Sequence, residues 1–202
     1  MLILKWRLQA RGYRVCNVDY ETRVDVLDRA IDAVERELAE RVPSDSRVHF
    51  VTHSLGGIVL RGLLARRTLP HAGRAVMLAA PNSGSEIADH FRGIRIVNRV
   101  WGPLAAQLGR RPEDFQQKLP RPSIPFGVIA GDQWINPAGP IWLPPPHDGT
   151  VSVESTRLAG MEDHLVLPYT HTFIMNPAVV ANQIDHFLRE GRFMCDAETK
   201  LR

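Results

Sequence analysis

Residues Arg47 to Gly57, R-V-H-F-V-T-H-S-L-G-G, decide the fold. The run from Val48 to Val51 is rich in β-branched and aromatic residues, which predicts a buried strand. The segment that follows from Ile58, I-V-L-R-G-L-L-A-R-R, is apolar with a helical period. We therefore expect a strand that turns directly into a helix at Ser54.

A serine on such a turn has two interpretations. It can be a nucleophile, because a sharp turn pushes the weakly nucleophilic hydroxyl toward a histidine that takes its proton. Gly56 supplies the small residue that the turn needs on one side, whereas Thr52 stands where glycine is usual on the other. The Leu55 N–H, at the start of the helix, would then face an oxyanion. Alternatively, Ser54 is only the N-cap of the helix.

The composition fits one soluble globular domain that spans residues 1–202. The hydrophobic share of 44%, the charged share of 23% and the net charge of +3 are ordinary values. The arginines are scattered rather than interleaved with aromatic residues, which argues against a nucleic-acid partner. We expect no transmembrane segment, and the start M-L-I-L-K-W-R is too short and too soon charged for a signal peptide. The compartment therefore stays open.

The two cysteines, Cys16 and Cys195, have no neighbours with metal-ligand spacing, so we expect no metal site. Cys16 lies in a strand-like run and is expected in the core. Nothing in the sequence supports a disulfide between the two.

Helical and strand-like segments alternate along the chain, and this alternation predicts an α/β fold. The fold would be a mostly parallel sheet with helices on both faces. The predicted helices cover residues 2–11, 24–42, 58–67 and a last helix after Asn176-Pro177; the predicted strands cover 13–18, 48–51, 75–80, 126–130 and 164–169. Residues 86–122 are less regular and could form a helical lid or a plain helical insertion.

The general base is expected where a strand ends, because ligands bind at the carboxyl edge of such sheets. His171 follows the strand at 164–169 and precedes the last helix. His164 lies at the wrong end of that strand, and His53 is adjacent to Ser54, where neighbouring side chains point apart. Two acids could orient His171. Asp132 follows the strand at 126–130, and Asp148 begins D-G-T-V-S-V-E-S-T.

Four segments together resemble the α/β-hydrolases of the lipase and esterase kind, similar to bacterial triacylglycerol-lipase-like and PGAP1-like hydrolases. They are T-H-S-L-G-G, P-N-S-G-S, D-G-T-V-S-V-E-S-T and T-H-T-F-I-M-N-P. The resemblance implies a serine hydrolase of carboxylic esters with Ser54, Asp148 and His171 as its catalytic set, and Asp132 as the alternative acid. It implies Leu55 as an oxyanion donor, a small ester or lipid as substrate, and no cofactor or metal.

The chain departs from that family at its start. Such hydrolases carry an earlier strand and a His-Gly loop that gives a second oxyanion donor. No His-Gly segment stands before Gly12. We therefore expect an N-terminal truncation that removes a central strand and half of the oxyanion hole. Two other functions stay open: an inactive hydrolase fold that binds a ligand or a partner, and an acyltransferase or amidase that uses the same three residues.

Overall fold

The centre of the protein is a parallel β-sheet. The computed structural model describes residues 1–19, 27–86, 108–110, 115–135 and 143–195. Within these residues four strands pair in the order β1-β2-β3-β4, and every pair is parallel. The strands are β1 (Val48–His53), β2 (Ala72–Leu78), β3 (Phe126–Gly131) and β4 (Asp163–Leu167).

The two middle strands are buried on both faces. Along β2, Ala75 and Met77 belong to one apolar cluster, whereas Val76 and Leu78 belong to the cluster on the opposite face. This alternation is the period of two that a strand imposes on its side chains. The continuous apolar runs in the sequence therefore mark strands that are covered on both sides, and the predicted α/β class is confirmed.

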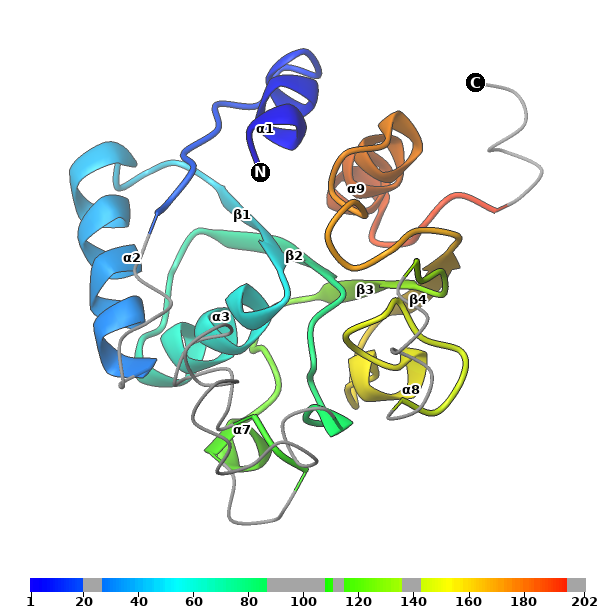
Figure 1. Cartoon of the computed structure of the whole chain (residues 1–202). Helices are drawn as coiled ribbons and strands as arrows, with labels where there is room; N and C mark the ends of the chain where they lie inside the picture. The colour runs from blue at the N-terminus through cyan, green and yellow to red at the C-terminus, as the bar shows by residue number, and fades with distance from the viewer. Residues whose placement is uncertain (20–26, 87–107, 111–114, 136–142, 196–202) are drawn as a thin grey trace.

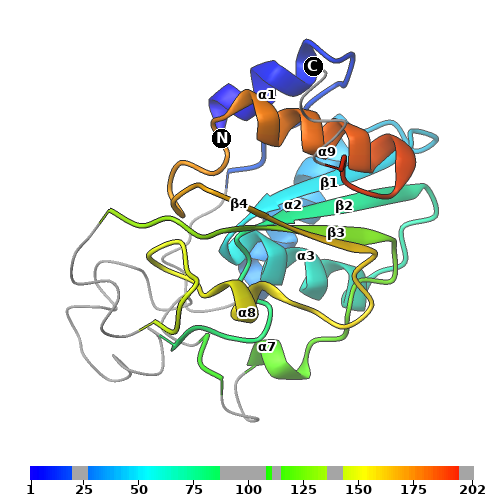
Figure 2. The same cartoon turned by 90° about the vertical axis from the view of Figure 1, so that its right-hand side faces the viewer.

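Helices cover both faces of the sheet (Figures 1 and 2). On one face lie α2 (Leu27–Arg41) and α3 (Leu55–Arg66), whose apolar residues pack into the first cluster. On the other face lie α1 (Leu2–Gln9) and α9 (Ala178–Glu190). The inner positions of α9 are the ones that the sequence predicted from their spacing: Val180, Ile184, Phe187 and Leu188.

Two short helices flank the carboxyl edge of the sheet. They are α7 (Phe115–Lys118), before β3, and α8 (Val153–Thr156), between β3 and β4. Ser152 caps α8, since its side chain accepts a hydrogen bond from the Ser155 N–H. The lid or insertion predicted at 86–122 lies largely outside the described residues, so both interpretations stay predictions.

The strand predicted at residues 13–18 is wrong, because this segment has no regular structure. A strand needs a partner for its backbone hydrogen bonds, and among the described residues β1 pairs only with β2. Side chains hold the segment instead: the Tyr13 hydroxyl donates to Asp185 at 2.9 Å. Cys16 is half-buried rather than in the core, and both Cys16 and Cys195 are free.

None of the helices in the described residues combines the length and apolar character that crossing a membrane requires.

We expect Phe187→Ala to destabilise the protein strongly. Phe187 is fully buried, and its ring lies 4.9 Å from that of Phe193 between α9 and the sheet. Truncation would leave a cavity and cost about 3–5 kcal/mol of unfolding free energy, measured by urea denaturation. Phe173→Ala is the matched control, because Phe173 is 55% exposed. Equal losses in the two variants would contradict this packing.

Candidate active site

Ser54 forms the whole turn between β1 and α3. The strand ends at His53 and the helix begins at Leu55. Ser54 has φ 53° and ψ −124°, a backbone conformation that is strained for any residue with a side chain. Two hydrogen bonds hold it there: the Ser54 N–H donates to the Leu78 carbonyl at 2.8 Å, and its own carbonyl accepts from the Gly57 N–H at 3.0 Å. The predicted sharp turn is therefore present.

Small residues let α3 approach the sheet at this turn. A Cβ atom on Gly57 would lie 2.6 Å from the Cβ of Ala80, closer than two carbon atoms can pack. Thr52, which replaces the usual glycine, fits into the turn at a cost. Its hydroxyl oxygen is buried without a hydrogen-bond partner among the described residues.

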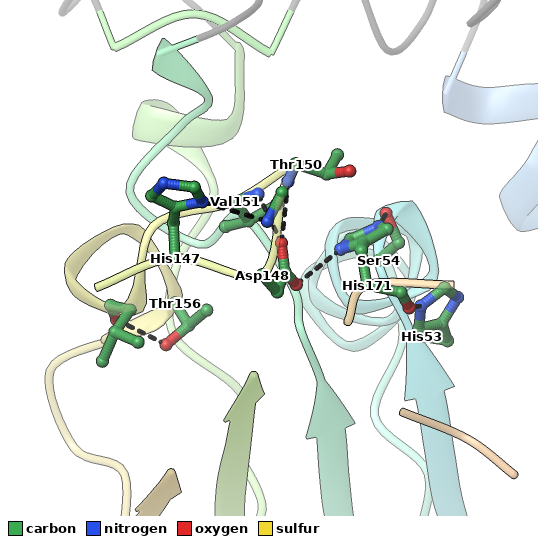
Figure 3. A network of polar contacts seen from close by, with 10 residues as sticks. His53, Ser54, His147, Asp148, Thr150, Val151, Thr156 and His171 are labelled. Atoms are coloured by element: carbon green, nitrogen blue, oxygen red, sulfur yellow. Dashed lines mark hydrogen bonds and ion pairs between the residues drawn. The ribbon is translucent and has the colours of Figure 1, made fainter. Parts of the chain in front are cut away.

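His171 lies between Ser54 and Asp148 (Figure 3). Its Nε2 is 3.0 Å from the Ser54 Oγ, and its Nδ1 is 2.7 Å from the Asp148 Oδ2. An ionised carboxylate only accepts hydrogen bonds, so Nδ1 carries the proton. In the neutral ring, Nε2 is then free to accept the proton of the serine hydroxyl.

The turn that carries Asp148 is built around its carboxylate. Asp148 is only 2% exposed. Its Oδ1 accepts hydrogen bonds from the Thr150 N–H at 2.9 Å and the Val151 N–H at 2.7 Å. Gly149 has φ +93°, which permits the tight turn. The Asp148 carbonyl also accepts from the His171 N–H at 3.0 Å, so the two residues are joined through backbone and side chain.

The alternative acid, Asp132, has other hydrogen-bond partners. It follows β3, as predicted, and its N–H donates to the Leu167 carbonyl at 3.2 Å. Its half-exposed side chain accepts a hydrogen bond from the neighbouring Gln133 at 3.4 Å. The carboxylate that contacts His171 belongs to Asp148.

Leu55, predicted as the oxyanion donor, is the first residue of α3. The first N–H groups of a helix have no acceptor inside the helix. The Leu55 N–H is thus available next to Ser54. The described residues contain no group of three or more side chains that could hold a metal ion.

A second buried carboxylate, which was not predicted from the sequence, lies near the site. Glu86 is 7% exposed, and its Oε1 accepts hydrogen bonds from the hydroxyls of Ser152 and Ser155, both at 2.7 Å. Arg110 also contacts Oε1, at 3.3 Å. Glu86 therefore ties the segment after β2 to α8, which follows the Asp148 turn. No local pattern reveals this contact, because its partners lie 66 and 69 residues away.

His53, which the sequence analysis set aside, contacts His171 rather than Ser54 (Figure 3). Burial, together with a smaller effect of the nearby His171, lowers the pKa of His53 to about 4. His53 is consequently neutral in the folded protein at neutral pH.

The geometry and the fold together define a class. No protein-family model matches this sequence, and comparison with curated proteins gives no match either. Solved structures do match over most of the chain, and esterases and lipases are among them. The chain therefore has the α/β-hydrolase fold.

Three of these structures illustrate the similarity. The metagenomic carboxyl esterase MGS0156 matches with a TM-score of 0.74 and 16% identity, over 93% of this chain and 69% of that chain. The mature lipase BlEst2 of Bacillus licheniformis matches with a TM-score of 0.67 and 15% identity, over 91% and 81% of the two chains. Phospholipase PlaB of Legionella pneumophila matches with a TM-score of 0.62 and 19% identity, over 76% of this chain and 40% of that one.

We expect the stability of the protein to fall in acid partly because of His53. Its pKa is about 4 when folded and about 6.5 when unfolded. Between these values the unfolded chain binds a proton that the folded protein does not, so the free energy of unfolding decreases as the pH falls through this window. Once the pH is below the folded-state pKa, the His53 contribution to this loss of unfolding free energy is complete and amounts to roughly 3 kcal/mol. The pKa values of His49, His147 and His164 are also lowered by burial and act in the same direction.

Urea denaturation between pH 7 and pH 4 isolates the part that belongs to His53. The variant His53→Leu should lose less stability over this range than the wild type. His71→Leu, at an exposed position, controls for the substitution itself. If the unfolding free energy depends on pH equally in the wild type and in His53→Leu, the loss of stability does not come from His53.

Proposed function

We propose that this protein is a serine-dependent hydrolase of carboxylic esters, of the esterase and lipase kind. The observation that carries the proposal is the continuous line of hydrogen bonds from Ser54 through His171 to Asp148, with distances of 3.0 and 2.7 Å. The strained turn at Ser54 supports it, since a plain N-cap needs no such conformation. The Ser54 side chain makes no capping hydrogen bond to α3 either.

In this proposal the reaction has two halves. In the first, the Ser54 oxygen attacks the ester carbonyl carbon while His171 takes the hydroxyl proton at Nε2. The tetrahedral intermediate then collapses: the bond to the alcohol breaks, the alcohol takes the proton from His171, and the acyl group stays on Ser54. In the second half, water replaces the alcohol and the same proton transfers release the carboxylic acid. Neither half requires a cofactor or a metal ion.

Asp148 would remain ionised throughout and act through His171. Its carboxylate orients the ring and stabilises the imidazolium that forms when Nε2 takes the proton. Its burial strengthens this interaction, because few water molecules can screen it. The backbone N–H groups of Thr150 and Val151 hold the carboxylate in place.

The oxyanion would be stabilised by the N–H of Leu55. Loss of one donor from such a site typically costs roughly 100- to 1000-fold in rate. The names of the similar structures, carboxyl esterase and lipase, support an ester or lipid substrate.

We expect a fluorophosphonate to label the purified protein at Ser54. The reagent phosphonylates an activated serine without requiring the right acyl chain, so it tests the mechanism before the substrate is known. Ser54→Ala should abolish labelling and ester hydrolysis but keep the circular dichroism spectrum. Ser44→Ala, in an exposed loop, should be labelled like the wild type. Absence of labelling in the folded wild type would favour a non-catalytic binding protein. If the protein labels but cleaves amides or transfers acyl groups rather than hydrolysing esters, an amidase or acyltransferase would replace the ester hydrolase.

The choice between the two acids can be tested with one pair of variants. Asp148→Asn should lower kcat by roughly 10³- to 10⁴-fold, because an amide no longer fixes the tautomer of His171 or stabilises its cation. Asp132→Asn should leave kcat close to the wild-type value. The reverse result would assign the acid to Asp132.

A further inference from the structure

His53 and Ser54 are consecutive residues, yet their side chains reach His171 from different sides (Figure 3). The Oγ of Ser54 lies 3.0 Å from the Nε2 of the His171 ring. The Nε2 of His53 lies 2.9 Å from the backbone carbonyl oxygen of the same residue. The two imidazole rings also contact each other, with centroids 4.9 Å apart and planes tilted by 47°.

The contact between His53 and the His171 carbonyl shows which group donates the hydrogen bond. A carbonyl oxygen only accepts hydrogen bonds, so the Nε2 of His53 must carry the hydrogen. Burial and the charge of the His171 ring lower the pKa of His53 and favour its neutral form. The hydrogen bond to the His171 carbonyl and the charge of Asp148 raise this pKa, but burial has the largest effect. A neutral ring beside His171 does not repel the imidazolium that forms when His171 takes a proton.

The backbone of His171 is therefore held on both sides. Its N–H donates to the Asp148 carbonyl at 3.0 Å, and its carbonyl accepts from His53. Without the second bond, only the turn closed by the Phe173 and Ile174 N–H groups on the Thr170 carbonyl would hold the peptide group after His171. A rotation of that peptide group would move the ring relative to Ser54, and a displacement of about 1 Å can cost roughly 100-fold in rate.

We infer that His53 is a positioning residue for the base: it fixes the backbone of His171 so that the ring stays within hydrogen-bond reach of Ser54. The end of β1 then sets the spacing between nucleophile and base: Ser54 is the nucleophile, and the preceding residue, His53, holds the base His171. This inference rests on the proposed function for its catalytic meaning.

The test compares three variants on the same strand, with a p-nitrophenyl ester as substrate. His53→Leu removes the donor and should lower kcat and the rate of phosphonylation by about 10- to 100-fold, with little change in KM. His53→Gln keeps a side-chain N–H and should recover most of this loss. His49→Leu is the matched control: His49 lies on the same face of β1, contacts the Arg74 N–H and the Tyr13 ring, and should leave kcat unchanged.

A second readout does not depend on activity. The Nδ1 proton that His171 shares with Asp148 should give a far-downfield proton NMR signal while the ring is held in place. We expect this signal in the wild type, in His49→Leu and in His53→Gln, and its broadening or loss in His53→Leu. If the wild type shows no labelling and no turnover, the proposed function fails, and this signal alone decides whether His53 positions His171.

Wild-type kcat together with an unchanged NMR signal in His53→Leu would overturn the inference. If His53→Leu does not fold, His53→Gln and His53→Asn decide instead. Both keep an amide donor, but the shorter asparagine side chain should not reach the carbonyl. A slow His53→Asn beside a fast His53→Gln supports the inference, and equal rates overturn it.

Discussion

The buried carboxylate of Asp148 is the constraint on which the site depends. A charge that is 98% removed from solvent is strongly unfavourable unless hydrogen bonds replace the lost water. Three N–H groups do so: those of Thr150 and Val151 on one oxygen and the His171 ring on the other. The contacts that make the burial tolerable are thus the same ones that shape the turn and orient His171.

The loops at the carboxyl edge of the sheet support that arrangement through a second buried carboxylate. Glu86 follows β2, and its two short hydrogen bonds reach the serines at the start and the interior of α8. Asn82 adds a bond from its side-chain amide to the Thr156 carbonyl at 2.8 Å. The turn of Asp148 and helix α8 are therefore fixed to the end of a central strand. This rigidity lets a loop between β3 and β4 serve as a precise partner for the turn at Ser54.

Much of the fold is readable from the sequence because buried parallel strands and amphipathic helices have local signatures. The apolar run at 75–80 predicts a strand covered on both sides, and the spacing of Val180, Ile184 and Phe187 predicts the inner face of α9. The segment at 13–18 shows where local pattern fails. Its residues favour a strand, but a strand exists only beside a partner, and no local pattern states which edges meet.

The candidate site, too, could be predicted only in part from the sequence. Ser54 and His171 could be predicted because each follows a strand, and the ends of parallel strands meet at one edge of the sheet. Asp132 and Asp148 could not be separated without the resemblance, since both occupy positions that suit an acid or a plain turn. His53 was set aside on a correct local argument, that it points away from Ser54. What it points toward is a carbonyl 118 residues away, and only the folded chain brings that group to it. Motif reasoning thus identifies groups at strand ends, whereas the contacts that hold those groups in place arise from the meeting of distant loops.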